Sequence, residues 1–337
     1  MTIRPYEHAM YAHCESGTVA GLLRHHGLTI SEPMVFGIAA GACAVYMKIP
    51  SMPLPVFELR TKPGDIRKNV ARKLGTTFKT ERFSDRSRAH DRLTTLLNTG
   101  IPVALQVDMF YMDYIPDYMR NHFNAHYIVA TAREDNDFIV SDCYYPTLSK
   151  LSTLSLEKGR FARGDFSPSG FMYQVTSAPL PDEPQLKKAV MRGIRQAAFT
   201  MIKLPIPFIG VTAIRRFARD IPSWPAKSRS VDELAHQIML IHLLLEERGT
   251  GGGGFRFMYA AFLQEASRLL GNDELFSLSK KMMNNGDKWR EIAMTAARSS
   301  KQRDLGPDRL ILLRDLVLER AEEEESLFRA LYALSRG

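Results

Sequence analysis

The sequence predicts an α+β fold in its first half and an all-α helical fold in its second half. In residues 1–178, helical patterns come first and strand patterns later, without the regular alternation that is typical of a parallel sheet. Beyond residue 184, strand patterns nearly vanish. The Pro-rich segment 177–184 lies between the two patterns and predicts the boundary between a domain of residues 1–178 and a helical domain of residues 184–337.

Local signals predict the elements of the first half. Apolar residues at helical spacing predict a helix over 16–26 that stops at Gly27, and Ser31 with Pro33 is typical of a helix start. Strands are expected at 42–49, 55–59, 76–83, 102–108, in the runs that begin at His126 and Phe138, and at 171–175, with helices at 64–74 and 85–98. We therefore expect a mostly antiparallel sheet that is preceded by helices.

Helical periodicity dominates the second half. Val231, Leu234, Ile238, Ile241 and Leu245 follow three- and four-residue spacing, and 255–270, 273–299 and 307–334 have the same pattern. The pattern predicts a helical bundle.

Composition restricts the class of protein. The chain has 337 residues, of which 45% are hydrophobic and 24% charged, which is enough for two globular domains. No apolar run reaches the roughly 18 residues that span a bilayer, and the N-terminus lacks the order of a signal peptide, so we expect a cytoplasmic protein without a membrane span. The three cysteines contain no CxxC pair, which favours reduced thiols and excludes a thiolate zinc knuckle.

A net charge of +8 suits an acidic partner. The basic residues are scattered and form no aromatic-interleaved stripe, so we expect no nucleic-acid binding. We also expect no metal site. His122 and His126 are four residues apart, but the residues that follow are rich in β-forming types and no HExxH motif is present.

Three residues carry the strongest chemical signal. Cys14 opens a helical stretch, His126 opens a strand, and Asp142 ends the next strand. A papain-like fold assembles a nucleophile, its base and the group that orients the base in this order. A helix N-terminus and an imidazole both favour the thiolate form of a cysteine. The same residues also fit a structural thiol and a buried strand histidine, and spacing alone does not separate the two interpretations.

The oxyanion donor is harder to assign. The Cys14 backbone N–H precedes the helix and is one candidate. Papain-like enzymes place a Gln about six residues before the cysteine, and here that position holds His8. Tyr11 is a further candidate.

The sequence resembles the butirosin biosynthesis protein H family over most of its length. The segments that carry the resemblance are His13-Cys14-Glu15-Ser16, 28–38 (LTISEPMVFGI), 100–114 (GIPVALQVDMFYMDY), Asn124-Ala125-His126-Tyr127, Val140-Ser141-Asp142 and the Gly-rich run 249–256 with Tyr259. The family's fold is similar to that of the papain-like C39 peptidases. Its namesake moves an aminoacyl group from the phosphopantetheine thioester of a carrier protein onto an aminoglycoside amine.

The resemblance implies a Cys14, His126 and Asp142 triad, with no cofactor apart from the phosphopantetheine that the donor carries. The sequence departs from the family pattern at Tyr127, at Thr131-Ala132-Arg133 and at Cys143-Tyr144, where a small residue, a Gly-Tyr pair and a Pro are usual. None of these departures removes a triad member. They leave the acceptor open.

Further residues are candidates for substrate binding. Tyr114 belongs to an aromatic group between two strands and would line an acyl channel. Gly252 and Gly253 precede a helix, where backbone N–H groups can cradle a phosphate, and Arg256 would add a charge. A mobile turn between helices fits the Gly-rich run equally well.

Three hypotheses follow. The first is an acyltransferase that moves an acyl group from a carrier-protein or coenzyme A thioester, through acyl-Cys14, to an amine or hydroxyl of a small-molecule acceptor in secondary-metabolite biosynthesis. The second is a cysteine hydrolase that acts on peptide, amide or thioester bonds. The third is a non-catalytic module that binds a carrier protein. The oligomeric state stays open, with a homodimer as one alternative.

Overall fold

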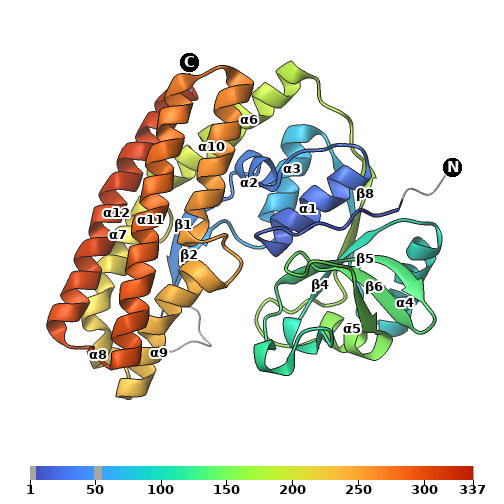
Figure 1. Cartoon of the computed structure of the whole chain (residues 1–337), viewed down its shortest axis with the longest axis horizontal. Helices are drawn as coiled ribbons and strands as arrows, with labels where there is room; N and C mark the ends of the chain where they lie inside the picture. Colours follow the sequence, from blue (N-terminus) through green and yellow to red (C-terminus); the bar gives the residue numbers. More distant parts are fainter. Residues whose placement is uncertain (1–4, 49–54, 337) are drawn as a thin grey trace. The chain divides into compact units, whose positions relative to one another are not determined.

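The computed structural model describes residues 5–48 and 55–336, which fold into two compact units. The first unit comprises Met1–Val35 and Ile66–Asp182, and the second comprises Phe36–Asp65 and Glu183–Gly337 (Figure 1). The chain enters the second unit at Phe36, returns to the first at Ile66, and enters the second again after the Pro-rich segment, at Glu183. The sequence did not predict that residues 36–65 belong to the helical unit.

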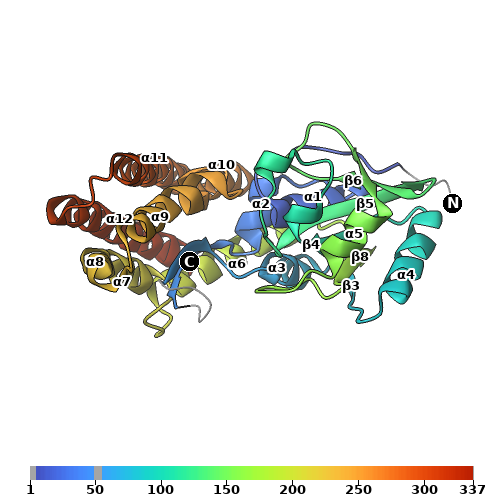
Figure 2. The ribbon, with the colours of Figure 1, turned by 90° about the horizontal axis from the view of Figure 1, so that it is seen from below.

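The first unit is an α+β domain built on a six-stranded sheet. Its strands have the order β3-β8-β4-β5-β6-β7, and every neighbouring pair is antiparallel (Figure 2). The strands are β3 (Thr77–Glu81), β4 (Val103–Val107), β5 (His126–Glu134), β6 (Asp137–Ser141), β7 (Ser149–Ser152) and β8 (Met172–Ser177). The helices are α1 (Cys14–His25), α3 (Asp65–Leu74, which begins at the boundary residue), α4 (Arg86–Asn98) and α5 (Thr153–Arg160), with 3-10 turns at Met109–Tyr111 and Asp117–Met119.

Helices α4 and α5 share one hydrophobic core with the sheet. Alternate residues of β4 and β5, such as Leu105 and Ile128, are fully buried beside Leu93 of α4 and Leu156 of α5. All five residues of β4 and the first five of β5 are buried, so these strands are recognised in the sequence as continuous apolar runs. Helix α1 contacts β5 and β8.

The second unit is a helical bundle that includes one β-hairpin. Its helices are α6 (Glu183–Ile202), α7 (Val211–Asp220), α8 (Trp224–Lys227), α9 (Val231–His242), α10 (Arg256–Leu270), α11 (Asp273–Gln302) and α12 (Pro307–Leu334). The hairpin consists of β1 (Ala42–Met47) and β2 (Val56–Arg60), and α2 (Glu32–Ile38) crosses from one unit into the other. Short η segments lie at Ile221–Ser223, Leu243–Glu247 (a π-helix) and Gly253–Phe255.

The hairpin belongs to the second unit because its partners are there. Strand β1 contacts α6 and α7, and Phe57 of β2 stacks on Phe217 of α7 with ring centroids 4.0 Å apart. Helix α11 contacts α9, α10 and α12, while α12 contacts α6 and α7. The contacts of the hairpin with α6 and α7 join sequence segments more than 120 residues apart, which local patterns do not report.

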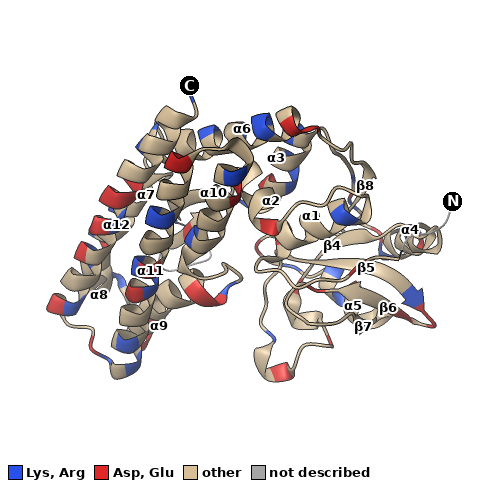
Figure 3. Cartoon of the chain, turned by 45° about the horizontal axis from the view of Figure 1, so that its top comes forward, with Lys and Arg blue, Asp and Glu red and all other residues tan. Residues whose placement is uncertain are grey.

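The structure confirms the predicted fold class, an α+β domain with an antiparallel sheet followed by an all-α region. Acidic and basic residues both occur along α11 and α12 (Figure 3). Over residues 5–48 and 55–336, no helix is both long and apolar enough to cross a membrane.

Candidate active site

Cys14 is the first residue of α1. His13 precedes it in extended conformation and caps the helix, since its Nδ1 accepts a hydrogen bond of 3.3 Å from the Ser16 backbone N–H. The unpaired N–H groups at a helix N-terminus create a positive potential that favours a thiolate. The expected position of Cys14 at a helix start is thus observed.

A buried carboxylate fixes the chain just before Cys14. Glu32 accepts hydrogen bonds from the backbone N–H groups of Ala12 (2.7 Å) and His13 (2.9 Å) and from the Ser16 hydroxyl (2.8 Å). Burial raises the pKa of Glu32, and these hydrogen bonds act against that rise. The carboxylate holds the turn that presents the thiol.

Antiparallel pairing brings the histidine and the aspartate together. His126 begins β5, and Val129 of the same strand pairs with Ser141 at the end of β6. Because the strands run in opposite directions, the chain that continues past Ser141 runs back beside the start of β5. Asp142 therefore lies next to His126, and their side chains are 1% and 0% exposed.

Three hydrogen bonds orient the carboxylate of Asp142. His126 Nε2 donates to Oδ2 at 2.7 Å, the Tyr114 hydroxyl donates to Oδ2 at 2.7 Å, and the Tyr144 backbone N–H donates to Oδ1 at 3.2 Å. Burial alone would raise the pKa of Asp142, but the positive charge of His126 and these hydrogen bonds lower it below its usual value. The aspartate is therefore ionised and fixes the imidazole in one orientation.

Cys14 is the second side chain that interacts with His126. Burial would lower the pKa of His126, but the Asp142 carboxylate, and then a hydrogen bond and the charge of Cys14, raise it to about 10. The Cys14 sulfur is 4.0 Å from the carbonyl oxygen of Ala125, the residue before His126. The three residues that the sequence analysis selected are brought together in one buried cluster.

The charge pair of His126 and Asp142 makes stability depend on pH. The pKa of His126 is raised, so its contribution is complete below about pH 6.5, the value for an unfolded histidine, and is lost as the pH rises toward about 10. The pKa of Asp142 is lowered, so its contribution is complete above about pH 4 and is lost as the pH falls through the lowered value. We expect the free energy of unfolding to fall by a few kcal/mol between pH 7 and pH 10.

Urea unfolding at several pH values checks this expectation. His126→Gln should lose most of the alkaline decline, because its side chain does not titrate. An equal decline in wild type and His126→Gln would show that other groups cause it.

Tyr144 covers the histidine. Its ring stacks on His126 with centroids 5.7 Å apart and an interplanar angle of 22°, and 36% of Tyr144 is exposed. Burial of the phenol, followed by the negative charges of Cys14, Cys143 and Asp142, raises the pKa of Tyr144, and a hydrogen bond with the Cys14 backbone opposes the rise. The phenol thus interacts with the Cys14 backbone, whose N–H is the candidate donor to an oxyanion.

Removal of this ring should expose the thiol. Cys14 is only 4% exposed, so we expect Tyr144→Ala to raise its rate of alkylation by iodoacetamide at least about tenfold. Peptide mapping locates the label. The matched control is Tyr118→Ala, since Tyr118 is 88% exposed and should leave the rate unchanged. Equal rates in wild type and Tyr144→Ala would contradict a covering role.

His8 and Tyr11 lie near the cluster with other partners. His8 places Nδ1 2.8 Å from the Ser141 hydroxyl and Nε2 2.8 Å from the carbonyl oxygen of Tyr145. Both ring nitrogens are therefore occupied, which does not support His8 as an oxyanion donor. The Tyr11 ring packs against Gly17 of α1, where an added Cβ would lie 2.5 Å from the Tyr11 Cβ.

Tyr114 lies beside the acid of the cluster. Its hydroxyl donates to Asp142 and so helps to orient the acid, while its part in lining an acyl channel stays a prediction. Its strongly raised pKa, which burial and then the Asp142 charge produce, keeps the hydroxyl protonated as a donor.

The Gly-rich run lies in the second unit and is held by internal contacts. The Gly252 N–H donates to the Thr250 hydroxyl at 3.0 Å, and the Gly253 N–H donates to the Glu246 carboxylate at 2.9 Å. Gly252 and Gly253 have φ values of +85° and +55°, so glycine is required by this turn into α10. A carboxylate that already occupies the N–H group does not support phosphate binding there.

Arg256 is 1% exposed and structural. Its guanidinium forms two 2.7 Å hydrogen bonds with the Glu324 carboxylate and also donates at 2.9 Å to the carbonyl oxygens of Leu59 and Gly254. All of its donor nitrogens are used within the second unit. The substrate contact expected for Arg256 is therefore not supported.

Glu32 and Tyr144 belong to the site, but local patterns in the sequence did not predict them there. Glu32 was recognised only as part of a helix start, and Tyr144 only as a departure from the family pattern. The only signal for Glu32 in the sequence was an acidic residue in the short segment that follows the cysteine helix.

A cysteine at a helix N-terminus, with a histidine that begins one strand and an aspartate that directly follows the adjacent antiparallel strand, is the arrangement of papain-like cysteine-dependent enzymes. Two family models match the chain. Residues 13–143 match the butirosin biosynthesis protein H N-terminal model, and residues 154–331 match the model described as a domain of unknown function, DUF4872. The chain belongs to the DUF4872 family, and its N-terminal domain is of the butirosin biosynthesis protein H type.

A solved structure is also similar in part. It is the crystal structure of a protein assigned to the C39-like peptidases from Bacillus anthracis, with 11% identity and a TM-score of 0.31, and the match covers 53% of this chain and 96% of that one. No curated protein matches the sequence.

Proposed function

We propose that this protein is an acyltransferase that moves an acyl group from a thioester donor to an amine or hydroxyl acceptor through an acyl-Cys14 intermediate. The observation that carries the proposal is the buried cluster of Cys14, His126 and Asp142 in a domain of the butirosin biosynthesis protein H type. The coarser class, a cysteine-dependent enzyme in biosynthesis, follows from the same two facts.

In the first half-reaction, the Cys14 thiolate attacks the thioester carbonyl carbon. The oxyanion forms beside the Cys14 backbone N–H, after the Tyr144 phenol has moved away. The imidazolium of His126 then gives its proton to the departing thiol as the carbon–sulfur bond of the donor breaks. The products are acyl-Cys14, a free thiol and a neutral imidazole.

In the second half-reaction, the acceptor attacks acyl-Cys14 and His126 takes its proton. The Cys14 charge, which helps to raise the pKa of His126, is absent while the sulfur carries an acyl group. The pKa of the imidazole is then lower, which suits a group that takes up and releases a proton near neutral pH. The acyl–sulfur bond then breaks, Cys14 leaves as the thiolate, and the proton stays on His126, which restores the starting ion pair.

Burial of the cluster supports transfer over hydrolysis. Cys14, His126 and Asp142 are 4%, 1% and 0% exposed, so bulk water has little access to the acyl-Cys14 carbonyl. An acceptor that fills the site displaces the remaining water and competes well with hydrolysis.

The donor and acceptor classes rest on chemistry and charge. A net charge of +8 favours the approach of an acidic carrier protein, whose phosphopantetheine arm delivers the acyl group, over a neutral donor. An acyl-coenzyme A thioester has the same reactive arm. The enzyme itself needs no further cofactor for these steps.

Product analysis tests the proposal. The protein is incubated with acyl-carrier and acyl-coenzyme A thioesters, with and without a panel of amines and amino sugars, beside Cys14→Ala. We expect an amide product that replaces most of the free acid once an accepted amine is present. If free acid is the product at every amine concentration, the protein is a hydrolase. If no donor is consumed, the binding-only alternative holds.

A further inference from the structure

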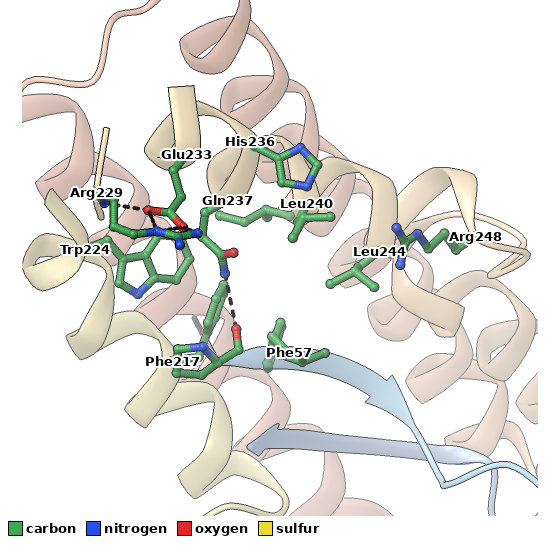
Figure 4. Close-up of a pocket in the computed structure, with 13 residues that line it drawn as sticks. Phe57, Phe217, Trp224, Arg229, Glu233, His236, Gln237, Leu240, Leu244 and Arg248 are labelled. Atoms are coloured by element: carbon green, nitrogen blue, oxygen red, sulfur yellow. Dashed lines mark hydrogen bonds and ion pairs between the residues drawn. The ribbon is translucent and has the colours of Figure 1, made fainter. Parts of the chain in front are cut away.

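The second unit contains a cavity that the chemistry at Cys14 does not use. Its volume is about 290 Å³, and every residue that lines it belongs to the second unit (Figure 4). The lining residues come from β2, α7, α8, α9, the π-helix that follows α9, and the residues next to these elements.

The body of the cavity is apolar. Phe57 and Phe217 stack face to face, and the Trp224 ring lies 5.9 Å from Phe217, so three aromatic rings form one wall. Leu240 and Leu244 lie on the opposite elements. Such a lining binds hydrocarbon or aryl groups by excluding water from them.

The two ends of the cavity differ in charge. Near Trp224, Arg229 forms an ion pair with Glu233, so the two charges at this end balance each other. Arg248 lies beyond Leu244 at the other end (Figure 4). Within residues 5–48 and 55–336, no carboxylate oxygen lies within 4 Å of Arg248.

Glu58 is the acid that interacts electrostatically with Arg248. It competes only weakly with a ligand anion for the Arg248 guanidinium. Burial raises the pKa of Glu58, while Arg60 and Arg248 act in the opposite direction. A carboxyl group with a raised pKa loses its charge more readily. In addition, Glu58 interacts with Arg60 as well as with Arg248. The Arg248 guanidinium is thus available to a ligand anion.

The helix that carries Leu244 is also irregular. After α9 ends at His242, residues Leu243–Glu247 form a π-helix, and Arg248 follows directly. A π-helix is less stable than an α-helix and recurs at functional sites, where it turns side chains toward a ligand. Here it separates the apolar wall from the cationic end.

We propose that this cavity binds a small amphipathic carboxylate, with its hydrocarbon or aryl body against the aromatic wall and its carboxylate at Arg248. With about 30 Å³ for each water-sized group, the cavity holds about ten non-hydrogen atoms. A medium-chain fatty acid or a phenylalkanoic acid has this size. The site is independent of the chemistry proposed for Cys14.

Calorimetric titration of the full chain with octanoate tests the proposal. We expect saturable binding at one site. Octanol, which has the same chain without the charge, should bind about tenfold more weakly, and acetate should not bind. Arg248→Gln should weaken octanoate about tenfold and leave octanol unchanged. The matched control is Arg268→Gln, at an exposed position of α10 outside the lining.

A second pair of variants locates the ligand. Leu240→Phe and Leu244→Phe each add volume inside the cavity and should abolish binding, whereas Leu312→Phe on the exposed face of α12 should not. Circular dichroism of each variant shows whether it is folded. Absence of saturable octanoate binding, equal binding of octanol, or full binding by both filled variants would each overturn the proposal.

Discussion

Cys14→Ala is expected to reduce turnover of a thioester donor by at least about 10⁴-fold, because removal of a nucleophile deletes the covalent route. The substitution should leave the fold intact, since alanine continues α1 and the cap from His13 and the Glu32 contacts do not use the thiol. Initial rates of thiol release from the donor measure the effect. Thermal unfolding in parallel separates loss of chemistry from loss of structure.

Cys43→Ala is the matched control. Cys43 is also a buried free thiol, but it lies on β1 in the second unit, and burial raises its pKa to about 11. We expect full activity from this variant. If Cys14→Ala keeps more than a few per cent of the wild-type rate, the covalent mechanism is wrong.

Glu324→Ala should cause the largest loss of stability. Glu324 is fully buried and accepts hydrogen bonds from Arg256, from the Asn285 amide at 3.0 Å and from the Trp289 indole at 2.7 Å. Its removal leaves the Arg256 charge buried without a counterion, which costs about 3–5 kcal/mol. We expect a decrease in Tm of roughly 10 °C by calorimetry.

The neighbouring residue provides the comparison. Glu325→Ala removes an acid whose partners, Arg215 and Arg329, are partly exposed, so about 0–1 kcal/mol should be lost. Similar Tm values for the two variants would show that the buried hydrogen bonds of Glu324 do not stabilise the protein more than the exposed ion pairs of Glu325 do.

Local patterns predicted the fold class because helix starts and strand patterns are visible within windows of a few residues. Spacing alone did not decide the triad of Cys14, His126 and Asp142, which was implied by the resemblance to the butirosin biosynthesis protein H family. The strands that carry His126 and Asp142 are adjacent in the chain, so their antiparallel pairing followed from sequence order.

The misplaced residues depend on long-range contacts. The β1–β2 hairpin reads as two more strands of the first domain, yet its partners α6 and α7 follow more than 120 residues later. Arg256 beside a glycine run resembles a phosphate site until Glu324, 68 residues away, is seen to neutralise it. The ring of Tyr144 reaches His126 only after the two strands pair.

Short and irregular elements were also missed. Strand β7 and helix α5 follow each other directly at 149–160, in a polar sequence without clear periodicity. The π-helix at Leu243–Glu247 continues the apolar spacing of α9, so its irregular backbone has no sequence signature.

Intact-protein mass spectrometry after rapid mixing with an acyl thioester tests the central claim most directly. We predict a mass increase of one acyl group on wild type, located by peptide mapping on Cys14, removed by an accepted amine and absent from Cys14→Ala. Donor consumption without any adduct on Cys14, or an adduct that persists unchanged in Cys14→Ala, would contradict the mechanism.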